Sequence, residues 1–250
     1  MDHEIKQFRY FLKDTIRQTI DFRMTDQRRG VAPPPVEKPY ARESQRIDLI
    51  AQEEWHSLAH VDLIHAIQNR KSHRHFRDKA LSIEELSFLL WATQGIRGSA
   101  DGTSVFRTVP SAGCRHALET YLCILNVAGL AAGIYRYLPV EHQLLVVSLE
   151  NNLPEEIVIA TFYQSFIGSA PVSFIWTTMP YRMEWRYHLA AHKVIAIDAG
   201  HVCQNLYLAA AAIGGGACGI GAYHQELMDK LLGVDGDDEF TIYLAVVGKI

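Results

Sequence analysis

Apolar residues recur at helical spacing in several stretches of the chain. Near the N-terminus they stand three or four positions apart, at Ile5, Phe8, Leu12, Ile16 and Ile20. This spacing predicts a helix over residues 5–20. Ser82 and Glu85 form a capping box, which predicts a helix that begins after Ser82 and stops at Gly95. Further helices are predicted over 61–67, from about Pro154, from about Arg186 to Gly214, and near 224–232.

Runs of β-branched and other apolar residues predict strands over 120–127, 172–178 and 240–247. Two shorter runs, 134–137 and 143–148, flank a turn and predict a hairpin. Helical and strand patterns are mixed along the chain, and no clean βαβ repetition appears. This mixture predicts an α+β fold rather than a doubly wound parallel sheet.

The first 59 residues differ in character from the rest. After the predicted N-terminal helix come three consecutive prolines, Pro33–Pro35, and a further proline at position 39. Consecutive prolines favour an extended chain and exclude helix. We therefore interpret 1–59 as an N-terminal helix and proline-rich extension that wraps the core or a partner. Residues 60–250 are interpreted as the main domain.

Composition excludes several classes of function. An apolar fraction of 48% and a charged fraction of 21% are ordinary for a folded domain. The formal net charge of −4 gives no general affinity for polyanions, so nucleic-acid binding is disfavoured. No signal-peptide pattern appears, and no uninterrupted apolar stretch reaches the ~20 residues that a membrane-spanning helix needs. We expect a cytoplasmic protein without a membrane partner. The four cysteines include no C-x-x-C pair, which disfavours a structural zinc site.

Two further motifs match known ligand sites only in part. Gly214–Gly219 fits G-x-G-x-x-G, but it follows a predicted helix, whereas the dinucleotide fingerprint requires a preceding strand. We therefore reject a Rossmann nicotinamide site. The stretch is either a glycine-rich helix end and turn, or bare backbone against which a planar cofactor can lie. His188 and His192 share one helix face but lack a glutamate and a third ligand, so no metal site is predicted.

Arg70, Ser72 and Arg74 follow the predicted helix 61–67 at alternating positions. Alternating residues of an extended segment point the same way. Two guanidiniums and one hydroxyl on one side can grip a phosphate. On its own, this segment could equally be a solvated basic turn, and 108–113 would be only a loop.

Six segments, in order along the chain, together resemble the nitroreductase-like family of flavoproteins, and specifically its SagB-type dehydrogenase branch. The resemblance covers roughly residues 60–250. Six matches in the right order are more specific than any single motif. The segments are Arg70-x-Ser72-x-Arg74, Pro110-Ser111-Ala112-Gly113-x-x-His116, Gly129-Leu130-x-x-Gly133-x-Tyr135-x-Tyr137, Asp198-Ala199-Gly200-His201, Gly216-x-Cys218-x-Ile220-Gly221 and Gly248-Lys249.

The resemblance implies a mixed, largely antiparallel sheet flanked by helices, FMN as cofactor, and a homodimer with the flavin at the subunit interface. It also implies the roles of individual residues in cofactor binding. Phosphate and ribityl groups would be held by Arg70, Ser72, Arg74 and Lys249. The isoalloxazine would be bordered by Pro110, Ser111, Ala112 and Gly113 and by Gly219, Ile220 and Gly221. The cation of Arg115 or Lys249 would stabilise reduced, anionic flavin.

The chain departs from this branch at Ala117, where proline is usual, and at one further position that matters for catalysis. Azoline-oxidising members carry a Lys-Tyr pair upstream of the D-A-G-H helix, and the corresponding residues here are Arg186 and Tyr187. Arginine keeps its proton near neutrality and cannot serve as a base, whereas Tyr187 can still act as an acid or hydrogen-bond donor. Both residues are candidates for catalysis. The alternative is that both face solvent or pack on the core at a helix N-terminus.

Three functions follow from the sequence. The first is an FMN-dependent dehydrogenase that moves a hydride through flavin N5 on a peptide heterocycle or another tailoring intermediate. The second is an NAD(P)H-dependent reductase of nitro compounds or quinones. The third is a catalytically silent subunit that binds flavin or a partner within a biosynthetic complex.

Overall fold

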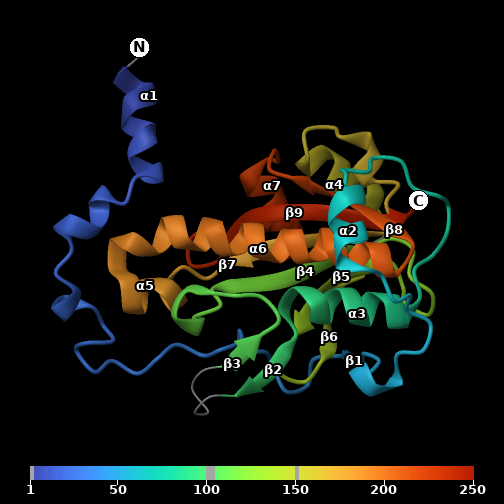
Figure 1. Cartoon of the computed structure of the whole chain (residues 1–250), viewed down its shortest axis with the longest axis horizontal. Helices are drawn as coiled ribbons and strands as arrows, with labels where there is room; N and C mark the ends of the chain where they lie inside the picture. Colours follow the sequence, from blue (N-terminus) through green and yellow to red (C-terminus); the bar gives the residue numbers. More distant parts are fainter. Residues whose placement is uncertain (1–2, 100–104, 150–151) are drawn as a thin grey trace.

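The computed structural model describes residues 3–99, 105–149 and 152–250. Seven strands form one sheet in the order β1-β6-β5-β4-β7-β9-β8, and each neighbouring pair is antiparallel (Figure 1). A separate antiparallel pair is formed by β2 and β3. The strands are β1 (Arg46–Asp48), β2 (Ile96–Ser99), β3 (Val105–Arg107), β4 (Leu118–Ile124), β5 (Gly133–Leu138), β6 (Gln143–Ser148), β7 (Val172–Thr178), β8 (Gly215–Ile220) and β9 (Phe240–Lys249).

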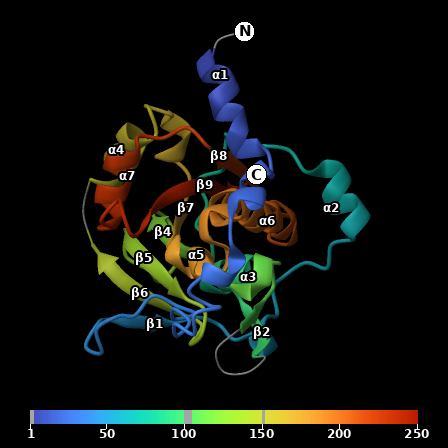
Figure 2. The same cartoon turned by 90° about the vertical axis from the view of Figure 1, so that its left-hand side faces the viewer.

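Helices cover both faces of the sheet. Figure 2 shows α3 and α6 on one face and α4 and α7 on the other. This arrangement confirms the predicted α+β class, with a large antiparallel sheet flanked by helices. The α-helices are α1 (His3–Phe8), α2 (Leu63–Asn69), α3 (Ile83–Gln94), α4 (Leu153–Ala160), α5 (Tyr181–Tyr187), α6 (Ala191–Ala212) and α7 (Gln225–Leu232).

The alternation of side chains along the central strands creates two cores. In β4, Leu122 and Ile124 pack with α3 and α6, whereas Tyr121 and Cys123 face the α4 and α7 side. Successive residues of a strand point to opposite faces, so a strand that is apolar throughout must be covered on both sides. The seven residues of β4 are accordingly all buried.

Predictions that rest on residues close together in the sequence are confirmed. Ser82 and Glu85 form both hydrogen bonds of the capping box, and α3 ends at Gly95 as predicted. The predicted hairpin is β5 and β6, and β7 has the predicted bounds. Gly233 adopts a left-handed conformation that ends α7, because glycine tolerates positive φ without steric cost.

The prediction of one helix over 5–20 is wrong. The α-helix ends at Phe8, and two 3-10 turns follow it, Arg9–Leu12 and Thr15–Thr19. No residue of either turn is buried. A short helix without tertiary packing is marginal in water, so the apolar spacing alone does not maintain it.

The prediction of one helix from Arg186 to Gly214 is also wrong at its start. The chain forms α5, then a 3-10 turn, and α6 begins only at Ala191. The Trp185 carbonyl accepts a hydrogen bond of 2.9 Å from the Gln27 N–H, a donor that lies in the N-terminal extension. His188 has a φ of 49° and ends α5. The N-terminal extension therefore occupies the Trp185 carbonyl, which in a continuous helix would accept a hydrogen bond from the next turn.

Residues 31–48 run across the bottom of the main domain to the sheet edge (Figure 1). There β1 pairs with β6. Lys38 anchors the segment, because its N–H donates to Glu119 and its carbonyl accepts from Arg136, each at 2.9 Å. Its ammonium also contacts Glu239. Among the described residues, no helix combines the length and the apolar character needed to cross a membrane.

Candidate functional site

The glycine-rich segment expected to be a turn is instead the edge strand β8, which pairs with β9. Its glycines are explained by close neighbours: a Cβ on Gly216 would lie 2.5 Å from the ring of His73, and a Cβ on Gly219 would meet the Tyr243 hydroxyl. Glycine within a strand often marks such a close approach of other groups. Gly216–Ile220 is therefore extended rather than turned, and its glycines leave room for His73 and Tyr243.

The cationic segment lies along this strand. Ser72 forms a parallel bridge with Ala217, and the His73 N–H donates to the Ala217 carbonyl at 2.9 Å. Further on, the Arg77 N–H donates to the Lys249 carbonyl at 2.9 Å. The fold thus brings together two segments that the sequence identified separately.

The two arginines of the cationic segment have different neighbours. Arg70 lies over the ring of Tyr207, 5.2 Å from its centroid, whereas Arg74 lies 6.0 Å from the ring centroid of Phe166. Both side chains are exposed, and no carboxylate of the described residues is within salt-bridge distance of either. Ser72 is grouped with Arg70, because its hydroxyl lies 2.9 Å from that of Tyr207.

A cavity of about 220 Å³ opens beside Arg70, between α2, the end of α6 and β8. Its polar side chains are basic or neutral, and neither Asp nor Glu is among the residues that line it. Such a lining suits an anion, because cations and N–H donors stabilise negative charge. The lining residues that carry this chemistry are His65, Asn69, Arg70, Lys71, His73 and Tyr207.

Asp198 of α6 holds the loop that contains Pro110–Gly113. Burial raises the pKa of Asp198 above its ordinary value, whereas hydrogen bonds from the Ser111 side chain and the Ala112 N–H oppose that rise. Gly113 has a φ of 59°, which glycine adopts at little cost. Two of the predicted motifs, D-A-G-H and P-S-A-G, are therefore in direct contact.

Arg186 and Tyr187 pack against this same loop. A Cβ on Gly113 would lie 2.6 Å from the Tyr187 hydroxyl and 2.9 Å from Nε of Arg186. The Arg186 guanidinium is 5.6 Å from the centroid of the Tyr187 ring. Both side chains are half-buried. The structure thus places the two candidate catalytic residues at the loop predicted to border the flavin.

Strained backbone positions lie in this loop and next to Tyr187, which contacts it. Cys114, His116 and His188 all have positive φ, at 54°, 46° and 49°. Non-glycine residues in this region are strained, and such strain is frequent at functional sites. The pKa of His116 falls to about 3, mainly because of burial and then because of the nearby Arg107 charge, so its imidazole is neutral at physiological pH.

The remaining predicted residues occupy varied positions. Lys249 is directed away from the exposed cations, since its ammonium donates to Glu85 and to the Ile213 carbonyl. Arg115 is buried, 5.0 Å from the Trp185 ring centroid. Pro110, at the start of its loop, and Gly221, after β8, are exposed, and Ile220 is buried.

Tyr207 was not among the site residues predicted from the sequence. It lies within a helix whose residues are mostly apolar, and that pattern predicts only core packing. Its hydroxyl nevertheless joins the cationic segment to β8, because it lies near Ser72 and accepts a hydrogen bond of 2.7 Å from the Gly219 N–H. No signal in a single sequence identifies a contact of this kind.

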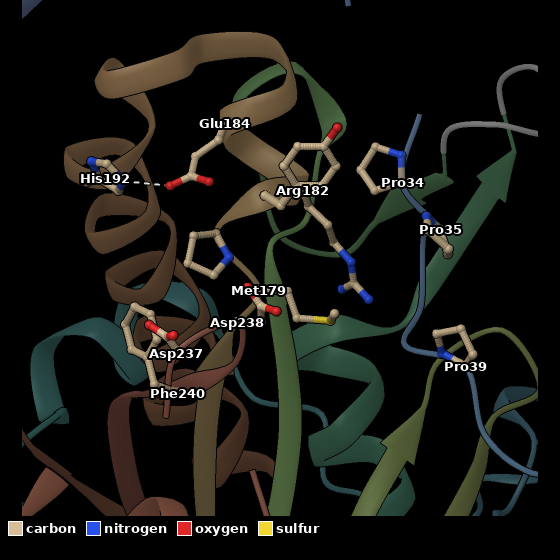
Figure 3. A pocket seen from close by; sticks show the side chains of 12 residues that line it. Pro34, Pro35, Pro39, Met179, Arg182, Glu184, His192, Asp237, Asp238 and Phe240 are labelled. Atoms are coloured by element: carbon tan, nitrogen blue, oxygen red, sulfur yellow. Dashed lines mark hydrogen bonds and ion pairs between the residues drawn. The ribbon is translucent and has the colours of Figure 1, made fainter. Parts of the chain in front are cut away.

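Figure 3 shows a second cavity, of about 450 Å³, between the proline-rich extension and α5. At its edge, Nε2 of His192, one of the two histidines considered as metal ligands, lies 2.7 Å from Oε1 of Glu184. Residues 3–99, 105–149 and 152–250 contain no group of three His, Cys, Asp or Glu side chains arranged to hold a metal. None of the predicted flavin-site residues lines this cavity.

Comparison with known proteins identifies relatives of this fold and site. Residues 67–249 match the sequence model of the nitroreductase family. A candidate nitroreductase of Methanocaldococcus jannaschii is 30% identical over 189 residues, which is 76% of this chain and 91% of that protein. The crystal structure of a candidate nitroreductase from Ralstonia eutropha superposes with a TM-score of 0.68 and 26% identity, covering 87% of this chain and 94% of that one.

Two other similar proteins are named for the processing or synthesis of peptide products. The trifolitoxin-processing protein TfxB of Rhizobium leguminosarum is 26% identical over 66% of this chain, which spans 40% of TfxB. A chain of the Escherichia coli microcin synthetase McbBCD, solved with a truncated pro-microcin bound, superposes with a TM-score of 0.61 and 22% identity. It covers 81% of this chain and 78% of that one. At this identity, the second similarity concerns the fold alone.

Proposed function

The chain belongs to the nitroreductase family of oxidoreductases, and from this premise we propose that it is an FMN-dependent dehydrogenase of the SagB type. Bound FMN would supply hydride transfer at its N5 atom. The observation that carries the proposal is the juxtaposition of Arg70 and Ser72 with the glycine-rich edge of β8. Exposed cations at the edge of this strand fit a ligand with a phosphate, because charged donors stabilise negative charge.

The residues present fit the phosphate of FMN. Arg70 and Arg74 have no carboxylate partner among the described residues, so their charge is available to an anion. Arg70 and Ser72 would bind the phosphate directly. Arg74 lies over Phe166, so it would contribute mainly through its charge unless its side chain turns. Lys249 already has two acceptors, and it would contribute only by leaving Glu85.

Tyr187 and Arg186 have different roles in this proposal. The Tyr187 hydroxyl, packed against Gly113, would hold or deliver the proton that accompanies hydride transfer. Arg186 would keep a fixed positive charge for an anionic substrate or intermediate, since arginine does not lose its proton. A cation, rather than a base, would thus stand in the position where the branch has lysine.

The similarity to TfxB favours a peptide or another tailoring intermediate as substrate. The similarity to nitroreductases favours the alternative, an NAD(P)H-dependent reductase of nitro compounds or quinones. A silent flavin-binding subunit is the third possibility. Turnover of a quinone with NAD(P)H identifies the reductase, whereas co-purification with a peptide-modifying partner, without turnover, identifies the silent subunit.

We further propose a homodimer with the flavin at its interface. The side of α6 away from the core is exposed, and so is the apolar side of α2. An obligate interface well above the ~1,600 Å² standard size would bury both surfaces. Light scattering tests this, because a monomer with full FMN occupancy would contradict it. The exposed residues are Ala196, Ile197, Gly200, His201 and Gln204 of α6, and Leu63, Ile64 and Ile67 of α2.

Cofactor binding is tested on the purified protein. We expect a yellow protein that releases FMN, not FAD, on denaturation. A colourless protein that also fails to bind added FMN would rule out the proposed function.

The role of Tyr187 is tested by Tyr187→Phe, which keeps the ring and removes only the hydroxyl. We expect the rate on the true substrate to fall by ~10²–10⁴ with FMN binding intact, the usual contribution of acid–base catalysis. An unchanged rate would remove Tyr187 from the mechanism and would leave FMN binding unaffected as a proposal.

A further inference from the structure

The hydroxyl of Tyr207 lies where the cationic segment, α6 and β8 meet. It accepts a hydrogen bond of 2.7 Å from the Gly219 N–H and lies 2.9 Å from the Ser72 hydroxyl. A backbone N–H can only donate, and a phenol carries a single hydrogen. The Tyr207 hydrogen is therefore directed to an acceptor other than Gly219, and Ser72 Oγ is within hydrogen-bond distance.

The direction of these hydrogen bonds determines where the Ser72 hydroxyl can donate. When Ser72 Oγ accepts the hydrogen of Tyr207, the hydrogen of Ser72 itself remains free to donate outward. The Ser72 side chain is exposed, and the Arg70 guanidinium lies over the ring of the same tyrosine. Arg70 and Tyr207 line the 220 Å³ cavity, and so do Lys71 and His73, the chain neighbours of Ser72.

We propose that Tyr207 is a positioning residue for the cofactor phosphate, which orients the Ser72 hydroxyl as a donor and supports Arg70 beside it. The inference rests on the proposed FMN function and adds the residue that prepares the phosphate site. The chain of donors runs from the Gly219 N–H through the Tyr207 and Ser72 hydroxyls to the phosphate oxygen. Such hydrogen-bond chains polarise one another, and each donor strengthens the next.

The competing explanation is that Tyr207 only fastens the segment to the body of the protein. The backbone already does this, since the His73 N–H donates to the Ala217 carbonyl at 2.9 Å. The two explanations differ in their dependence on the phosphate. A general loosening weakens binding of any flavin, whereas a misdirected Ser72 hydroxyl weakens binding only of a flavin that carries a phosphate.

The experiment therefore compares FMN with riboflavin, which has the same ring system and no phosphate. Dissociation constants of both are measured by fluorescence titration for the wild type and Tyr207→Phe, which keeps the ring beneath Arg70. We expect the FMN constant to rise about 10-fold, the equivalent of one hydrogen bond to a charged group, and the riboflavin constant to stay within about twofold. Tyr223→Phe is the matched control, because its hydroxyl donates only to the Thr241 carbonyl in the described structure.

Ser72→Ala gives a second, independent arm that does not depend on the folding of the tyrosine variant. It should produce the same selective loss for FMN, and the double variant should lose little more than either single one, because both act on one hydrogen-bond chain. The role of Tyr207 would be overturned if Tyr207→Phe lost as much affinity for riboflavin as for FMN, or if neither single variant lost affinity for FMN. Either result would leave the proposed FMN function standing. A wild type that binds neither flavin would overturn the proposed function itself.

Discussion

Two groups of cationic side chains in this protein differ in almost every physical respect. Arg70 and Arg74 are exposed, and no described carboxylate pairs with them. The second group surrounds Glu119, which lies 2.6 Å from Nη2 of Arg182, and its members are buried except for the half-buried Lys38. It comprises Lys38, Arg107, Arg136 and Arg182, with Glu119 and Glu239 as their carboxylate partners.

The difference separates arginines that stabilise the fold from those proposed to bind a ligand. Taking a charge out of water is expensive, so a buried cation needs a counter-ion or hydrogen-bond acceptors in the fold. Arg107 meets this need with the Gln94 side chain and the Val36 carbonyl, at 2.9 and 2.8 Å. Burial still lowers its pKa to about 10. Exposed cations carry no such need, and Arg70 keeps its charge available for a ligand.

The largest expected effect comes from removing one partner of the buried pair. Although burial alone would raise the pKa of Glu119, Arg182, Arg136 and Arg107 hold it below its ordinary value. Arg182→Met removes the closest of these charges and should lower the free energy of unfolding by about 3–5 kcal/mol. Urea unfolding measures the change. Arg74→Met is the control for loss of an arginine and should cost less than about 0.5 kcal/mol; equal losses would erase the distinction between the two groups.

The next effect concerns binding rather than stability. Arg70→Ala should weaken FMN binding about 10- to 100-fold, the worth of a hydrogen bond to a charged group, and leave unfolding within about 0.5 kcal/mol of the wild type. Isothermal titration with FMN measures the first, and thermal unfolding of the FMN-free protein the second. Arg42→Ala, another exposed arginine, should change neither. A large loss of stability at Arg70 would place it with the structural group.

The sequence predicts well those elements whose signals are local. The capping box of α3, the hairpin of β5 and β6 and the left-handed Gly233 each depend on residues a few positions apart. The start of α6 was not predictable, because the hydrogen bond that interrupts the helix comes from Gln27. The strand β8 was not predicted because glycine has a low strand propensity. Its glycines are needed because side chains from distant parts of the sequence, His73 and Tyr243, pack directly against them.

The candidate site follows the same rule. The motifs around Arg70, Gly113 and Gly219 were found from the sequence, and their contacts with Tyr207, Asp198 and one another came only from the fold. Lys249 was assigned to the phosphate by resemblance, and only the structure reveals that Glu85 is its partner. An isolated sequence does not separate a lysine that binds a ligand from one that holds two elements together.

Lys249 therefore tests whether one cation can belong to both groups, the structural one and the one proposed to bind a ligand. Lys249→Met keeps the apolar stem and removes the ammonium that joins the end of β9 to Glu85 of α3 and to the end of α6. We expect a loss of about 1–2 kcal/mol in unfolding free energy, measured in urea without flavin, since a charged hydrogen bond is lost at a largely buried site. The FMN affinity of the folded variant then shows whether Lys249 also binds the cofactor. An unchanged affinity means that Lys249 is only structural, and a 10-fold loss means that it also reaches the phosphate.

The smallest expected effect is a pH dependence at the same buried cluster. Burial is the main cause that raises the pKa of Glu37 to about 7 from an ordinary 4.5, with the Glu141 and Glu119 charges adding to it and the Val140 N–H and Arg107 opposing it. Between these two values the folded state binds more protons than the unfolded state. Stability should therefore decrease as pH rises from about 4.5 to about 7, and then show no further loss from this group.

Glu37→Gln removes this titration and keeps an acceptor for the Val140 N–H. Because Glu37 is only half-buried, solvent screening limits the expected difference to about 1 kcal/mol. Urea unfolding of both proteins at about pH 5 and about pH 8 measures it, and the wild type should lose more stability than the variant over that interval. Histidines with lowered pKa, such as His142, titrate in both proteins, so their contribution cancels in the comparison. Parallel pH profiles for the two proteins would mean that Glu37 is ionised in the folded state at all these pH values and belongs with the solvated charges.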